Sequence, residues 1–242
     1  MRAYLGCDIG RIREENQDSI RAVDFPDGVL ALVCDGMGGM QSGGTASKIA
    51  VSEAEAHFCA GYAADMDDAQ ICELLRASAA AANRSVYEAA VRSRVRGRMG
   101  TTLVGAFARD DRCCIVNIGD SRAYLITADG SIRQLTTDHT VVQLLYERGE
   151  ITAEERQTHP RRNELMRAIG VTCRLLSDTQ TVPLGAGDRL LLCSDGLYNM
   201  IPEERLAELV CTVPPAQLTE VCIAEANANG GRDNISVILL TP

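Results

Sequence analysis

Four apolar runs in this chain adjoin an aspartate. Residues 29–34, 114–119 and 190–194 lead directly into Asp35, Asp120 and Asp195, and Asp233 precedes the run 235–240. Runs of this length, rich in aliphatic and β-branched residues, predict buried strands. Each acid then lies where a buried strand reaches solvent. Asp-Gly after a strand is also a common hairpin signal, so a turn explains any one of these motifs taken alone.

The hydrophobic pattern predicts strands, then helices, then strands again. Strands are expected at 3–9, 19–24, 29–34, 101–108, 113–118, 122–127, 132–135, 179–182, 189–194 and 235–240. Helices are expected from Thr45 or Ser47 to about residue 60, and at 68–95, 140–148, 202–211 and 215–228, with short helical turns in the polar segment 150–166. Short turns between consecutive strands predict antiparallel sheets with the helices outside them. No linker or repeat divides residues 1–242, so we expect one domain.

A glycine-rich stretch distinguishes Asp35 from the other acids. Residues 36–44 hold more glycine than a two-residue turn requires, and glycine lets backbone groups approach an ion or a phosphate closely. The stretch is not a P-loop, because no Gly-Lys-Ser/Thr closes it. It also departs from a dinucleotide-binding fingerprint, since Gln41 stands in place of the third glycine.

Acids from several strands would repel one another if they converged on one point. With an effective dielectric constant of ~20, two carboxylates ~5 Å apart repel by roughly 3 kcal/mol. Hard divalent cations such as Mg²⁺ and Mn²⁺ take oxygen ligands and would reverse the sign of that energy. The pattern of strand-end acids therefore indicates a metal site.

Composition and charge exclude several classes of function. The chain has 242 residues, 46% of them hydrophobic and 24% charged, which is typical of a folded protein with a sizeable core. A net charge of −9 disfavours binding to nucleic acid or to an anionic membrane, because both need a basic face. Neither a leader-like N-terminus nor a membrane-length apolar run of ~20 residues is seen, so we expect a cytoplasmic protein.

Most of the ten cysteines are predicted to be structural. They show no Cys-x-x-Cys spacing, and most lie in apolar runs, where cysteine is a small buried hydrophobic residue. Cys34 and Cys193 lie within two residues of candidate metal ligands. Oxidation at these two positions is one hypothesis for redox sensitivity of the site.

The segment from Asp8 to Asp18 places charged and amide side chains between two predicted strands. A solvated loop explains this composition. The alternative is that Arg13 binds an anion with its planar guanidinium while Asp18 orders metal-bound water.

These motifs together resemble the metal-dependent protein phosphatases of type 2C, in particular stand-alone bacterial members. The resemblance covers nearly the whole chain and rests on motifs in this order: Asp8-x-Gly10-x-x-Arg13-x-x-Asn16-Gln17-Asp18, Asp35-Gly36-Met37-Gly38-Gly39, Gly100-Thr101-Thr102, Gly119-Asp120-Ser121-Arg122, Leu135-Thr136-x-Asp138-His139, Arg162-Asn163-x-Leu165-x-Arg167-Ala168-Ile169-Gly170, Ser194-Asp195-Gly196-Leu197 and Gly231-Arg232-Asp233-Asn234. It implies an α+β fold, a four-layer αββα sandwich of two central antiparallel sheets flanked by helices.

The resemblance also implies a role for each candidate residue. Asp35 would bridge two divalent ions, Mn²⁺ or Mg²⁺, and the carbonyl group of Gly36 would bind the second. Asp195 and Asp233 would complete the first site, and Asp120 with Asp195 would hold a third ion. Asp18 would contact metal-bound water, and Arg13 would bind the substrate phosphate.

The function implied is that of a protein serine/threonine phosphatase. Water activated by the two ions would hydrolyse phosphoserine and phosphothreonine without a phospho-enzyme intermediate. The expected partners are phosphorylated proteins and a cognate serine/threonine kinase acting on the same targets. We expect a monomer that binds neither nucleic acid nor membranes.

Two departures from the family pattern, and two further segments, bear on activity. Gln17 stands where many relatives have glutamate, and Met37 stands where animal members have the histidine proposed to protonate the leaving group. That proton donor is unassigned, since His139 and His159 are more typical of structural or surface histidines.

Residues 146–166, with Arg161 and Arg162, match a variable flap linked by hypothesis to substrate choice. The basic run Arg92, Arg94, Arg96 and Arg98 fits a solvated helix end or a dock for acidic phosphopeptides.

Two other classes of function remain alternatives at this point. One is a non-catalytic scaffold with the same fold, although such proteins usually lose the metal-binding aspartates. The other is a two-metal nuclease or phosphodiesterase, which the acidic composition disfavours. Hydrolysis of p-nitrophenyl phosphate with Mn²⁺, but not of bis-p-nitrophenyl phosphate or DNA, would distinguish the three.

Overall fold

The computed structural model describes residues 1–38, 42–95 and 99–242. The strands are β1 (Arg2–Asp8), β2 (Asp18–Phe25), β3 (Gly28–Gly38), β4 (Met99–Thr101), β5 (Leu103–Ala108), β6 (Arg112–Ile118), β7 (Arg122–Ile126), β8 (Ile132–Gln134), β9 (Asp178–Pro183), β10 (Arg189–Cys193) and β11 (Ile235–Thr241). The helices are α1 (Ser42–Gly61), α2 (Asp68–Arg92), α3 (Val141–Glu147), α4 (Ala153–Thr158), α5 (Asp195–Tyr198), α6 (Glu203–Thr212) and α7 (Pro215–Ala228).

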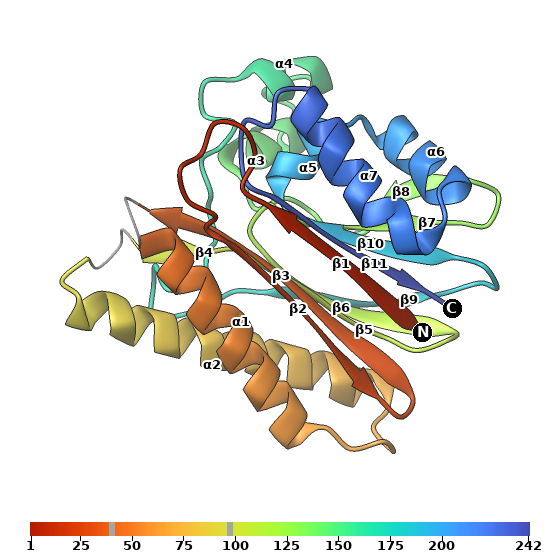
Figure 1. The fold of residues 1–242 in the computed structure, drawn as a ribbon. Helices are drawn as coiled ribbons and strands as arrows, with labels where there is room; N and C mark the ends of the chain where they lie inside the picture. The colour runs from red at the N-terminus through yellow and green to blue at the C-terminus, as the bar shows by residue number, and fades with distance from the viewer. Residues whose placement is uncertain (39–41, 96–98) are drawn as a thin grey trace.

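The strands form two antiparallel sheets. Among the described residues, five strands pair in the order β1-β11-β10-β7-β8, and the second sheet has the order β2-β3-β5-β6-β9 with β4 also paired to β3. Helices α1 and α2 cover the outer face of the second sheet, and α5, α6 and α7 cover the outer face of the first (Figure 1). The predicted four-layer αββα sandwich is confirmed.

Three apolar layers hold the four structural layers together. Strand β3 contributes side chains to two of these apolar layers. Its Val29, Ala31 and Val33 face the other sheet, while Leu30 and Leu32 face α1 and α2. All five side chains are at most 2% exposed. A strand buried on both faces must be apolar at every position, and this accounts for the continuous apolar run in the sequence.

The pairing of strands brings distant parts of the chain to one end of the sandwich. Asp18 on β2 is the register partner of Asp35 on β3. In the other sheet β1 pairs with β11 along its whole length, from Arg2 opposite Thr241 to Asp8 opposite Ile235, so the two termini lie side by side (Figure 1). The segment after Asp8 and the segment before Ile235 therefore meet at the same end.

The predicted elements are present with shifts of one to a few residues, apart from two differences. The expected strand 101–108 is divided into β4 and β5 at Thr102, whose N–H donates to the carbonyl oxygen of Asp35 at 2.8 Å. The expected helix 68–95 ends at Arg92, and Arg94 has a φ of 57°, which a continuing right-handed helix excludes. Along the described parts of the chain, every helix is too short or too polar to cross a membrane.

Candidate metal centre

Asp35 lies inside a strand. Strand β3 continues past it to Gly38 and pairs there with β4, so the hairpin-turn explanation is wrong for this residue. Two threonines fix its backbone, because Asp35 N–H donates to Thr102 Oγ1 at 2.9 Å and Thr101 Oγ1 donates to the Asp35 carbonyl oxygen at 2.8 Å. The carboxyl group therefore extends from a backbone that is held on both sides.

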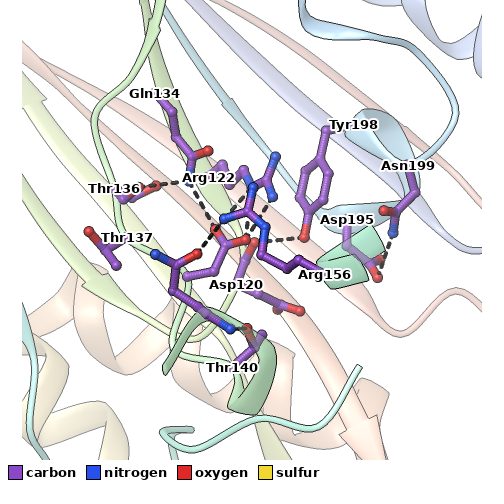
Figure 2. Close-up of polar contacts among 12 residues, drawn as sticks. Asp120, Arg122, Gln134, Thr136, Thr137, Thr140, Arg156, Asp195, Tyr198 and Asn199 are labelled. Atoms are coloured by element: carbon purple, nitrogen blue, oxygen red, sulfur yellow. Dashed lines mark hydrogen bonds and ion pairs between the residues drawn. The ribbon is translucent and has the colours of Figure 1, made fainter. Parts of the chain in front are cut away.

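The other sheet contributes Asp195 and Asp233 at the ends of its strands, and Asp120 lies in the turn that crosses from one sheet to the other. Asp195 follows β10 as the first residue of α5, and Asp233 lies just before β11. Asp120 follows β6 in the turn that leads to β7. Asn199, directly after α5, donates to Asp195 Oδ2 at 3.1 Å, and the Tyr198 hydroxyl group donates to the carbonyl oxygen of Asp120 at 3.0 Å (Figure 2).

The acids are close enough to perturb one another. Burial, followed by repulsion from Asp18 and Asp195, raises the pKa of Asp35 well above its usual range. Burial, followed by repulsion from Asp120 and Asp233, does the same to the pKa of Asp195. Burial is also the main reason that the pKa of Asp120 rises to about 7 and that of Asp18 to about 6. Such a cluster is unfavourable unless it binds protons or cations.

The residues present fit a divalent cation that prefers oxygen ligands. Asp18 is only 6% exposed, and its Oδ2 accepts from Ser194 Oγ at 2.7 Å while its Oδ1 is buried without a hydrogen-bond partner. A Cβ at position 36 would lie 2.3 Å from the carbonyl oxygen of Gly43, so only glycine fits beside Asp35. A water molecule held near the ions would satisfy the free oxygen of Asp18.

The carboxylates do not enclose an ion by themselves. Within residues 1–38, 42–95 and 99–242, no group of three or more histidine, cysteine, aspartate or glutamate side chains has an arrangement that could hold a metal ion unaided. Water and backbone carbonyl oxygens would have to complete the coordination. Mg²⁺ usually keeps several waters and takes only one or two carboxylates, so an open site of this kind suits it.

Arg13 lies at the edge of the acidic cluster. Its Nη2 donates to Asp233 Oδ2 at 2.6 Å, and its side chain is 53% exposed. Hydrogen bonding to Asp233 raises the pKa of this guanidinium, so it is charged at all relevant pH values. A guanidinium has five N–H donors. Arg13 can therefore hold Asp233 with one amino group and bind an anion with the others.

A cleft of about 1030 Å³ opens over three of the clustered acids. Asp120, Asp195 and Asp233 line it together with four arginines, Arg122, Arg156, Arg162 and Arg232. Arg156 and Arg162 come from the segment 146–166, so this part of the expected flap does lie beside the acids. Arg161, by contrast, forms a two-point ion pair with Glu164 at 2.7 and 2.8 Å.

Sequence reasoning missed a buried network behind Asp120. Arg122 makes a bidentate ion pair with Asp138, and the two side chains are only 13% and 11% exposed. The guanidinium of Arg122 also lies 3.7 Å from the ring centre of Tyr198, whose hydroxyl group reaches Asp120 (Figure 2). Arg122 and Asp138 both belong to motifs quoted above, but their pairing across β7 and the following loop could not be derived from spacing.

The two histidines considered as proton donors lie outside the lining of the cleft. His139 is 7% exposed, and its Nδ1 accepts from the Gly119 N–H at 3.1 Å, so it supports the turn before Asp120. His159 Nδ1 accepts from the Arg161 N–H at 3.1 Å.

The second half of the basic run, Arg96 and Arg98, and the glycine-loop residues 39–41 lie outside the described residues.

Comparison with known proteins decides the family. The model of the protein phosphatase 2C family matches residues 11–226. The chain belongs to this family. Among curated relatives, it is 39% identical over 245 residues to the serine/threonine phosphatase stp of Listeria monocytogenes, covering 99% of this chain and 95% of that one.

Solved structures agree with this assignment. The serine/threonine phosphatase of S. agalactiae matches with a TM-score of 0.91 and 30% identity, over 98% of both chains. The catalytic domain of the phosphatase PstP, solved in complex with two manganese ions, matches with a TM-score of 0.83 and 32% identity, over 98% of this chain and 96% of that one. This 2C phosphatase is thus a metal-dependent protein serine/threonine phosphatase that acts on phosphoproteins with Mn²⁺ or Mg²⁺ as cofactor.

Proposed function

We propose that this phosphatase performs its reaction at the cluster of Asp18, Asp35, Asp120, Asp195 and Asp233, within a single catalytic domain that spans residues 1–242. The observation that carries this proposal is the convergence of acids from both sheets, with burial and mutual repulsion raising the pKa values of Asp35 and Asp195. Because the carboxylates repel one another when no cation is bound, the cluster favours the binding of divalent cations.

Each acid has a distinct part in holding the ions. Asp35 would hold two of the ions, one of them together with Asp195 and Asp233 and the other together with the carbonyl oxygen of Gly36. Asp120 and Asp195 would hold a third ion. The bound ions supply positive charge and lower the pKa of water so that it becomes a nucleophile near neutral pH.

The protein's own groups position the reactants. Asp18 accepts a hydrogen bond from Ser194 with one oxygen and has its other oxygen free to orient water for attack on phosphorus. Arg13, held against Asp233, offers its remaining N–H donors to the phosphate oxygens and so counters their charge as the bond to the leaving group breaks. Phosphoserine carries close to two negative charges at pH 7, which the bare acidic cluster would repel.

The proposed function includes an oligomeric state, a cellular compartment and an opposing enzyme. The enzyme acts as a monomer in the cytoplasm and reverses the action of a cognate serine/threonine kinase. Three of the four arginines that line the cleft, Arg156, Arg162 and Arg232, contact acidic residues that flank the phosphorylated side chain, while Arg122 pairs with Asp138.

The site is tested by isosteric replacement. Asp35→Asn and Asp195→Asn should each lower Mn²⁺-dependent hydrolysis of a phosphothreonine peptide by about a thousandfold or more. The control is Asp110→Asn, which should retain activity because the Asp110 side chain is 86% exposed. Normal turnover by either cluster variant would refute the assignment. Activity toward p-nitrophenyl phosphate but not toward bis-p-nitrophenyl phosphate or DNA would exclude the scaffold and nuclease alternatives.

A further inference from the structure

Two cysteines from different layers meet at one threonine. Cys72 lies in the second turn of α2, and Cys114 lies in the middle of β6. The sulfur of Cys72 lies 3.5 Å from Thr181 Oγ1, and the sulfur of Cys114 lies 3.6 Å from the same oxygen atom. Thr181 is on β9, directly opposite Cys114 in the strand pairing. Both sulfurs are therefore within hydrogen-bonding reach of one hydroxyl group.

The direction of each side chain explains why both sulfurs lie close to Thr181. On β6, Cys114, Val116 and Ile118 face α2, whereas Cys113 and Ile115 face the other sheet. The Cys114 thiol also approaches the carbonyl oxygen of Asp68 at 3.6 Å, one helical turn before Cys72. Cys114 thus lies beneath the start of α2, and Cys72 lies at the edge of the same interface.

The two thiols differ in exposure. Cys72 is partly exposed and can meet a small solute, while Cys114 is 2% exposed and is shielded from solvent. Cys34 and Cys193, which lie within two residues of Asp35 and Asp195 in the sequence, are both 0% exposed, so burial shields them from oxidants in solution.

The two thiols also differ in acidity. Hydrogen bonding from Cys114 is the largest cause that lowers the pKa of Cys72, to about 6, and Thr181 assists. The same hydrogen bond and burial raise the pKa of Cys114 far above its usual range. A partly exposed thiolate beside a protonated buried thiol is the arrangement expected of an attacking and a resolving cysteine.

We propose that Cys72 and Cys114 form a peroxide-reactive dithiol that closes to a disulfide joining α2 to β6. The Cys72 thiolate attacks one oxygen of a hydroperoxide, so that an S–O bond forms and the O–O bond breaks. The leaving oxygen takes up the proton that Cys72 released, giving water or an alcohol. Cys114 sulfur then attacks Cys72 sulfur, the S–O bond breaks, and the hydroxide leaves as water with the Cys114 proton. The two sulfurs lose two electrons and the peroxide gains them.

The position of the pair predicts the consequence of closure. Cys114 lies on the outer face of the second sheet, whereas Asp120 follows the end of the same strand. The disulfide would therefore leave the acidic cluster untouched. A bond between residues 72 and 114 constrains the unfolded chain, so oxidation should make the enzyme more resistant to heat.

The Mg²⁺-loaded enzyme is treated with a small excess of hydrogen peroxide, blocked with N-ethylmaleimide and digested for mass spectrometry. The expected result is a Cys72–Cys114 cross-linked peptide, loss of two thiols per chain, reversal by dithiothreitol and a melting temperature raised by about 5 °C or more. Cys72→Ser should abolish the cross-link and the shift. Cys59→Ser, which removes an exposed cysteine on α1, should leave both unchanged.

Either of two outcomes would overturn the proposal. One is over-oxidation of Cys72 to sulfinic acid with Cys114 still reduced, because a resolving thiol in place would prevent it. The other is a disulfide that links different cysteines. Because cross-linking and melting are measured independently of phosphatase activity, failure here is distinct from failure of the catalytic assignment.

Discussion

Arg13 Nη2 donates to Asp233 Oδ2 at 2.6 Å across a sequence separation of 220 residues. The contact closes the acidic cluster between the loop after β1 and the loop before β11. It also means that the cation proposed to bind the substrate phosphate is oriented by a residue proposed to bind metal. An ion pair shared in this way couples the placement of substrate to that of the cofactor.

Arg13→Lys should lower kcat/KM for a phosphothreonine peptide by about 10- to 100-fold. An ammonium group keeps the charge but lacks the planar set of N–H donors, so it cannot hold Asp233 and a phosphate together. Steady-state kinetics at saturating Mn²⁺ measure the effect. Arg21→Lys is the matched control, because Arg21 is similarly exposed and pairs with Glu55. Equal kinetics for both variants would contradict the role of Arg13.

The stability of the metal-free enzyme should fall as pH rises from about 5 to 7.5. The folded-state pKa of Asp18 is about 6, above its ordinary value of 3.8, so near pH 5 the folded state holds a proton that the unfolded chain has lost. This stabilisation disappears as the pH rises through 6 and the folded state loses the proton as well. In EDTA the wild type should melt roughly 5 °C lower at pH 7.5 than at pH 5. Asp18→Asn should show a smaller difference. An identical pH dependence in the two proteins would show that Asp18 does not contribute.

Divalent cations should raise the melting temperature at pH 7.5. Ions that bind only the folded state at a hundred times their dissociation constant contribute about 2.7 kcal/mol, or roughly 5–10 °C for a chain of this size. Differential scanning fluorimetry with Mg²⁺, with Mn²⁺ and with EDTA measures the shift. Asp195→Asn should lose most of it, and Asp110→Asn should keep it. A melting point that EDTA leaves unchanged would count against the metal centre.

Arg122→Met should destabilise the protein by about 3–5 kcal/mol, because it leaves the Asp138 carboxylate buried without its ion-pair partner. Thermal melting should then occur roughly 10 °C lower. Arg112→Met removes an arginine that pairs at the surface with Asp111, and it should leave the melting temperature almost unchanged. The double variant Arg122→Met with Asp138→Asn should recover part of the loss. Equal effects of the two single variants would contradict the importance of the buried pair.

Most of the fold could be predicted from local pattern. The run from Val29 to Cys34 is apolar on both faces, which is possible only in a strand covered on both sides, and the structure places it there. The short helix α5 was missed, because a single turn after Ser194 has too few residues to show a helical period. The break at Thr102 was missed as well, since it depends on hydrogen bonds to Asp35, far away in the sequence.

The sequence by itself determined the strands, the helices, and the set of acids and motifs that identify a 2C phosphatase, because these depend on residue type and short-range order. Only the tertiary structure decided which groups meet: Asp18 beside Asp35, Arg13 on Asp233, Arg122 on Asp138, and Cys72 next to Cys114. These contacts depend on strand register and on how helices pack on sheets. Both are set by the burial of many side chains at once, and the spacing of the residues concerned does not encode them.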